Sequence, residues 1–303
     1  MTRIRARLRV VLALAAGLAI AGGSAVRAQQ TSQASPSELV RETVENEVTS
    51  TASGTRLMFR QDKETAHGSQ TKLILETREG MAGLLVAIDG KPLNTQQRQA
   101  EQARVEGLAS DPQELKKKQK TEKEDAERTL RIMKALPDAF LYEPDGSEPE
   151  KPGMGSPGEE LVRLKFRPNP KYDPPTHTEQ VLTGMQGYLL IDAKQRRIAK
   201  IDGRLVKEVG FGWGILGHLD KGGHFMVVQR DLGKGDWEIT RMDLDFAGRA
   251  LLFKKIGIKS TEVLSDFRPA PSNLTFAQAV EFLKEQEAEL AGNQQQNGGD
   301  PQK

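Results

Sequence analysis

The chain has 303 residues with 44 basic and 42 acidic side chains, so its net charge of +2 gives no strong overall field to attract nucleic acid or acidic lipid. The absence of cysteine excludes disulfide bonds, thiolate metal sites and a cysteine nucleophile. The length is sufficient to bury one hydrophobic core.

The N-terminus has the pattern of an export signal. Four arginines lie within the first nine residues, and the apolar run Val10–Ile20 that follows is too short to span a bilayer. Val26-Arg27-Ala28 matches a small-x-Ala cleavage site. We therefore expect a signal peptide over residues 1–28, cleaved near Ala28, a polar linker over 29–35, and a mature chain in the periplasm without a transmembrane span.

Residues 36–291 are expected to form one β-rich domain that includes helices. Ser35-Pro36-Ser37-Glu38 is a helix start, with an N-cap, a proline at N1 and an acid at N3. A helical insertion is predicted over residues 94–136, with two helices, the second stopped by Pro137. The basic cluster Lys116–Lys120 is neutralised by acids on adjacent turns, so it indicates a solvated face.

The remainder of the domain is predicted to form short antiparallel strands. A flexible loop rich in proline and glycine is predicted over residues 143–158. After it, apolar and polar residues alternate and short turns follow, which favours antiparallel pairing. Thr275–Gln278 is a capping box that begins a last helix, and residues 292–303 are expected to be a disordered tail. The predicted fold class is α+β, an antiparallel sheet curved into a half-barrel, with an N-terminal helix, an inserted helical pair and a C-terminal helix.

A glycine-rich segment, Gly212–Gly217, formally matches the dinucleotide motif G-x-G-x-x-G. That motif requires a helix to begin at the last glycines. Here Gly222-Gly223 follows within a few residues and a strand comes next, so nucleotide binding is not expected. The apolar side chains of this loop, Phe211 and Trp213 among them, either close an edge of the core or line a ligand-binding mouth.

Catalytic and metal-binding patterns are weak. His218 and His224 flank Asp220, but a metal site needs a third converging ligand, so surface histidines are the favoured interpretation. Ser156 lies outside any nucleophile-elbow motif. We expect no catalytic residue, no metal and no cofactor. An exported hydrolase would need a cleft that collects His218, Asp220 and a further carboxylate.

Two hairpins carry a resemblance to a known family. Leu85–Leu93 contains a strand that ends in an Asp-Gly-Lys turn, and Tyr188–Asp192 leads into Arg197–Ile201. With the order of elements, these resemble the periplasmic lipoprotein carriers of the LolA/LolB-like group. The resemblance implies an incomplete barrel whose apolar concave face, lidded by helices, holds acyl chains. The charged insertion from Asn94 and the loop Gly210–Gly223 depart from that pattern.

The sequence therefore predicts an exported, non-catalytic binding protein, with no nucleic acid among its partners. Its ligand would be apolar or lipid-like, because the short or highly charged helices leave part of an apolar sheet face uncovered. The alternative is an envelope interaction domain with a fully packed sheet that binds another envelope protein. The candidate lining residues, each also a candidate core residue, are Phe166, Tyr188, Phe211, Trp213 and Phe225.

Overall fold

The computed structural model describes residues 35–51, 55–211, 217–233, 235–250 and 254–297. The helices are α1 (Pro36–Thr51), α2 (Thr95–Ser110), α3 (Pro112–Ala139), α4 (His177–Gln180), the 3₁₀ turn η1 (Val181–Gly184) and α5 (Phe276–Asn297). The strands are β1 (Leu57–Thr65), β2 (Gly68–Glu76), β3 (Met81–Ile88), β4 (Lys91–Pro92), β5 (Phe140–Pro149), β6 (Glu160–Pro168), β7 (Met185–Asp192), β8 (Arg197–Leu205), β9 (Val209–Phe211), β10 (Gly217–Leu219), β11 (His224–Asp231), β12 (Trp237–Ala250) and β13 (Lys254–Pro269).

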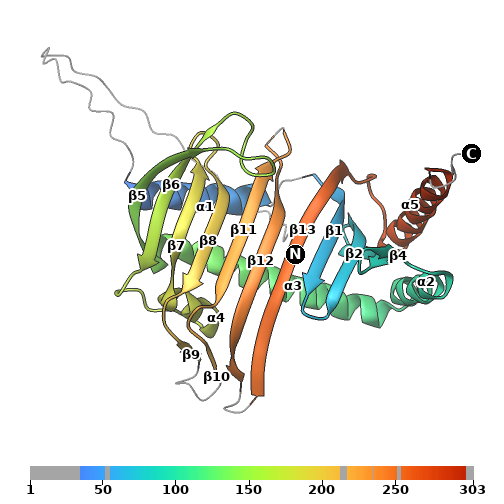
Figure 1. Cartoon of the computed structure of the whole chain (residues 1–303), viewed down its shortest axis with the longest axis horizontal. Coiled ribbons are helices and arrows are strands. Elements are labelled where there is room, and N and C mark those ends of the chain that lie inside the picture. The colour runs from blue at the N-terminus through green and yellow to red at the C-terminus, as the bar shows by residue number, and fades with distance from the viewer. Residues whose placement is uncertain (1–34, 52–54, 212–216, 234, 251–253, 298–303) are drawn as a thin grey trace, which may run out of the picture.

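The predicted fold class is confirmed, because the strands form one large antiparallel sheet that stays open. Its order is β4-β3-β2-β1-β13-β12-β11-β8-β7-β6-β5, with β9 and β10 attached to β12. Strand β13 pairs with β1, so the first and last strands of the chain lie side by side within the sheet (Figure 1). Among the described residues, no helix is both long and apolar enough to cross a membrane.

Helices α1 and α3 cover one face of the sheet, here called the rear face, which lies behind the strands in Figure 1. They pack over β5 to β8, where a large core forms. Alternate residues of each strand point into this core because side chains along a strand alternate between faces. The most deeply buried aliphatic members are Val40, Leu164, Leu189, Ile191 and Leu205.

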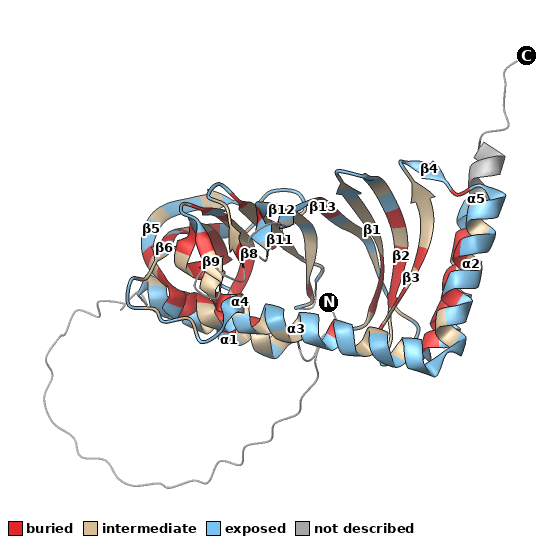
Figure 2. Cartoon of the chain, turned by 90° about the horizontal axis from the view of Figure 1, so that it is seen from below, coloured by how far each residue is buried: buried red, intermediate tan, exposed pale blue. Residues whose placement is uncertain are grey.

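Helices α2 and α5 cover the opposite, front face at the other end of the sheet. They pack over β2 and β3 at the right of Figure 2. The register Met58↔Leu75 places these two side chains on one face, and Phe276 and Leu283 of α5 pack against them. The sheet therefore has two cores, on opposite faces and at opposite ends.

The sequence signals for helix starts are present as local hydrogen bonds. The Ser35 hydroxyl accepts the backbone N–H of Glu38 at 3.2 Å, and the Asp111 carboxylate caps α3. The hydroxyl of Thr275 accepts the Gln278 N–H, while the Gln278 side chain accepts the Thr275 N–H. These are the reciprocal bonds of a capping box.

Some predicted boundaries differ from the structure. Much of the loop predicted over 143–158 is strand, because β5 continues to Pro149 in register with β6 and tolerates its prolines as an edge strand. The helical insertion runs past Pro137 to Ala139, since one proline in the last turn does not end α3 at once. Likewise, α5 extends to Asn297, beyond the predicted start of the tail.

Candidate functional site

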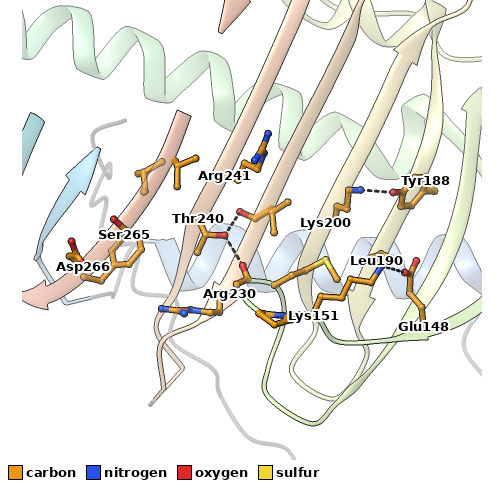
Figure 3. A pocket seen from close by; sticks show the side chains of 17 residues that line it. Glu148, Lys151, Tyr188, Leu190, Lys200, Arg230, Thr240, Arg241, Ser265 and Asp266 are labelled. Carbon is orange, nitrogen blue, oxygen red and sulfur yellow. Dashed lines mark hydrogen bonds and ion pairs between the residues drawn. The ribbon is translucent and has the colours of Figure 1, made fainter. Parts of the chain in front are cut away.

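A pocket of about 740 Å³ lies on the front face, over the middle of the sheet. Strands β7, β8, β11, β12 and β13 form its floor, and residues 151–154 of the β5–β6 connection form one wall (Figure 3). The opposite wall is the end of β13, where Asp266 has a positive φ of 55° and the register with β1 shifts. Such a shift bends a strand locally and changes the direction of its side chains.

The floor of the pocket combines apolar and cationic side chains. In the register, Leu190 of β7 pairs with Lys200 of β8, which pairs with Val228 of β11. Arg241 of β12 pairs with Val228 and with Val263 of β13. These side chains therefore share the front face. Leu190 belongs to a small front-face core with Met154, Leu161, Ala199 and Trp237.

The wall is fixed by hydrogen bonds of the segment that precedes β6. Gly155 donates its N–H to Gln229 at 2.8 Å and accepts the Asp231 N–H at 3.1 Å, so the segment pairs with β11. The backbone φ of Gly155 is +72°, a conformation that favours glycine. The buried Ser156 hydroxyl donates to the Asp192 carboxylate at 2.7 Å and accepts from the Gln195 amide. The Ser156 hydroxyl therefore anchors the wall of the pocket.

Several cationic side chains line the pocket beside the apolar ones. Lys151 pairs with Glu148 at 3.1 Å, and Arg241 pairs with Asp243 at 2.8 Å. Arg230, from β11, also lines the pocket; in the register it lies opposite Glu238 of β12, and no ion pair joins its guanidinium to a described carboxylate. An arginine without a partner at the edge of an apolar surface is suited to bind the anionic group of a ligand.

A polar cluster lies beside the pocket. Lys200 donates to the Tyr188 hydroxyl at 2.5 Å and contacts Asp202 at 3.1 Å, while His224 Nε2 lies 3.0 Å from Asp202. Burial opposes the charge on Lys200, but the hydrogen bonds with Tyr188 and Asp202 outweigh burial and raise its pKa. Burial likewise opposes ionisation of Asp202, but hydrogen bonds from His224 and Lys200 lower its pKa overall. Both groups stay charged near neutral pH.

The structure separates the predicted lining residues. Tyr188 lines the pocket, with the Arg163 guanidinium 3.7 Å from its ring centroid. Phe166 is fully enclosed in the rear core, and Phe211 and Phe225 pack against that core from its border. Trp213, like the glycine-rich segment around it, lies outside the described residues.

His218 gathers two carboxylates, which the sequence pattern alone did not predict. Its Nε2 lies 3.2 Å from Asp220 and 3.8 Å from Glu208, and the three ligand atoms could hold a metal ion. Glu208 lies in the turn between β8 and β9, and pairing of β9 with β10 brings it close to His218. The three residues lie outside the lining of the pocket.

Sequence reasoning missed the cations of the pocket. The alternation of Lys200 and Asp202 with apolar residues is typical of any half-exposed strand, so it does not distinguish a site from a solvated face. Arg230 and Arg241 lie on different strands, and only the sheet register places them around one floor. Comparisons with protein-family models, with curated proteins and with solved structures find no match.

Proposed function

We propose that this protein is an exported, non-catalytic binding protein whose ligand is a lipid-like anion held in the front-face pocket. The observation that carries the proposal is Arg230, a cation that makes no ion pair with a described carboxylate and lies in one pocket with Val228 and Val263. The volume of about 740 Å³ lies within the range of small-molecule sites. The resemblance to lipoprotein carriers supports the same class of ligand, although the proposed pocket is on the face opposite α1 and α3.

The ligand chemistry follows from the two parts of the pocket. Val228 and Val263 would contact an acyl chain, and burial of each methylene contributes about 0.8 kcal/mol. Arg230 would bind the carboxylate or phosphate group, since a charge-assisted hydrogen bond contributes about 1.5–3 kcal/mol. Lys151 and Arg241 already have acidic partners and would act mainly by adding positive potential.

The test compares oleate with methyl oleate, which share the chain and differ in charge. We expect isothermal titration of the mature chain to show oleate binding. Arg230→Ala should weaken it by about 10- to 100-fold, which is the loss of one charge-assisted hydrogen bond. The ester should bind wild type and variant equally. Arg167→Ala, which removes an exposed arginine of β6, is the matched control and should leave both affinities unchanged. Absence of oleate binding to the wild type would contradict the proposal.

Metal binding is the second candidate function, favoured by the convergence of Glu208, His218 and Asp220. Ligands at about 2.0–2.1 Å from a zinc ion lie roughly 3.3 Å from one another, close to the spacings of 3.2 and 3.8 Å seen here. Equilibrium dialysis with Zn²⁺ tests it. One equivalent bound by the wild type and lost in His218→Ala would support a metal site, and no retained zinc would reject it.

A further inference from the structure

The front-face pocket contains two opposite charges that do not pair with each other. Six charged residues line this pocket. Four of them make ion pairs, namely Glu148, Lys151, Lys200 and Arg241. The other two are Arg230 and Asp266, and no ion pair joins either of them to another residue that the structure describes. Together they offer one position for an anion and one for a cation.

Asp266 lies in a β-bulge at the end of β13. The register with β1 shifts there, so that Asp266 and Phe267 together oppose the single residue Phe59. The Phe267 ring packs against Phe59, with ring centroids 5.6 Å apart. The extra residue of a bulge changes the direction of side chains locally, and here the Asp266 side chain lines the pocket. Figure 3 shows it on the opposite side of the pocket from Lys151, with Arg230 between them in this view.

The backbone of Asp266 has a conformation that usually belongs to glycine. Its φ of 55° is in the left-handed region, and the first residue of such a bulge is commonly glycine. Aspartate tolerates this region better than most residues, but it still adopts it at some cost in free energy. This tolerance explains why aspartate is possible here, but it does not explain why glycine is absent. Residues held in such conformations cluster at ligand-binding sites, which indicates a use for the carboxylate.

The neighbouring arginine does not occupy the Asp266 carboxylate. Arg60 lies opposite Ser265 in the register and donates hydrogen bonds to Asp62 at 2.8 and 2.9 Å. The pKa of Arg60 is raised mainly by its hydrogen bond with Asp62, and the charge of Asp266 adds a smaller contribution. Asp266 is exposed, and none of the described side chains donates a hydrogen bond to its carboxylate. The carboxylate can therefore accept hydrogen bonds from a ligand.

We infer that the ligand of the front-face pocket is a zwitterionic lipid, with its phosphate bound by Arg230 and its primary ammonium group bound by Asp266. An ethanolamine phosphate headgroup has this chemistry. A carboxylate accepts hydrogen bonds, so it favours a primary ammonium, which donates them, over a trimethylammonium group, which has no N–H. This inference rests on the proposed function, because it assigns the headgroup of the same ligand.

The experiment is isothermal titration of the mature chain with three lysophospholipids. They share a myristoyl chain and a phosphate, and they differ in the attached group, which is ethanolamine, glycerol or choline. We expect the ethanolamine lipid to bind about fivefold more tightly than the glycerol lipid, which lacks the ammonium. The factor is modest because Asp266 is exposed. The choline lipid should also bind less tightly than the ethanolamine lipid, and the preference should decrease as salt is raised.

Two variants of Asp266 separate a role in binding from a role in folding. Asp266→Asn keeps the shape of the side chain and should abolish the preference for the ethanolamine lipid without weakening oleate binding. Asp266→Gly should abolish the preference as well, and its urea midpoint should be at or above that of the wild type, since glycine adopts the left-handed region without strain. Asp89→Asn is the matched control and should leave the preference unchanged, because Asp89 also has a positive φ, of 49°, but does not line the pocket.

The outcomes distinguish this inference from the proposed function. Binding of oleate without a preference for the ethanolamine lipid overturns the inference and leaves the proposed function standing. A preference that survives in both Asp266 variants also overturns the inference, and a lower urea midpoint in both of them would then assign the carboxylate a structural role. Absence of binding by oleate and by all three lysophospholipids contradicts both proposals.

Discussion

The two ends of the sheet are covered in opposite ways. At the β5–β8 end, α1 and α3 pack on the rear face, whereas at the β1–β3 end, α2 and α5 pack on the front face. The strands between the two ends, including β11 and β12, are therefore covered on the front face by neither pair of helices. The pocket lies on this central part of the front face.

The difference shows how an open sheet can keep a stable fold and a free surface together. Each core buries its apolar side chains at its own end of the sheet. The centre of the front face therefore needs no helix to cover it. The front face of the centre instead carries paired charges, such as Lys200–Asp202 and Arg241–Asp243. The packing of the two cores therefore leaves the centre of the front face as a surface of mixed polarity that contains the pocket.

The largest effect is expected at the β1–β3 end. Phe276 is fully buried where α5 meets β2 and β3, and Phe276→Ala should lower the free energy of unfolding by about 4 kcal/mol through cavity formation. Leu290→Ala on the same helix is the control, since Leu290 is exposed, and should change it by less than about 0.5 kcal/mol. Urea denaturation measures both. Equal effects would contradict a core centred on α5.

The β5–β8 end is held by a buried ion pair in addition to apolar packing. Arg197 of β8 contacts Glu47 of α1 at 2.9 Å, with side chains only 6% and 2% exposed. Glu47→Ala leaves the guanidinium buried and should cost about 3 kcal/mol.

A second ion pair joins the same two regions and provides the control. Arg196 contacts Glu42 at 2.9 Å, but both side chains are about 40% exposed. Glu42→Ala should therefore cost less than about 1 kcal/mol. Thermal and urea unfolding of both variants measures the difference, and a similar loss in the two would show that burial does not decide the contribution.

A smaller, pH-dependent effect is expected at the centre. The pKa of Asp202 is lowered in the folded state, so its contribution is complete above the unfolded pKa and is lost as pH falls through the folded pKa. Asp202→Asn should cost about 1 kcal/mol at pH 7, and the difference from wild type should disappear as pH falls through the lowered pKa of Asp202. Asp245→Asn, which removes an exposed ion pair with Lys259, is the control and should cost less than about 0.5 kcal/mol at pH 7. Urea unfolding midpoints measured between pH 2 and 7 test this expectation. A loss of stability that does not vary with pH would refute it.

The sequence allowed the elements and fold class to be predicted, but it did not allow the pocket to be predicted. Capping residues such as Ser35, Asp111 and Thr275 act within one turn, so their effect is visible locally. The cations Lys200, Arg230 and Arg241 come together only through the order and register of the strands. The sequence also did not show that the helices cover opposite faces of the sheet. Helical periodicity shows that a helix has an apolar side, but it does not show which sheet face that side covers.

The smallest effect is expected in the part of α3 that joins the two covered ends. The pairs Lys120–Glu124 and Lys123–Glu127 are spaced i, i+4 at 3.9 Å and are well exposed. Lys120→Gln with Lys123→Gln should lower the free energy of unfolding by less than about 1 kcal/mol, and less in high salt, because exposed helical pairs contribute about 0.3–0.5 kcal/mol each. Urea denaturation at low and high ionic strength measures this. A loss of several kcal/mol would show instead that the middle of α3 packs tightly and that the two ends share one core.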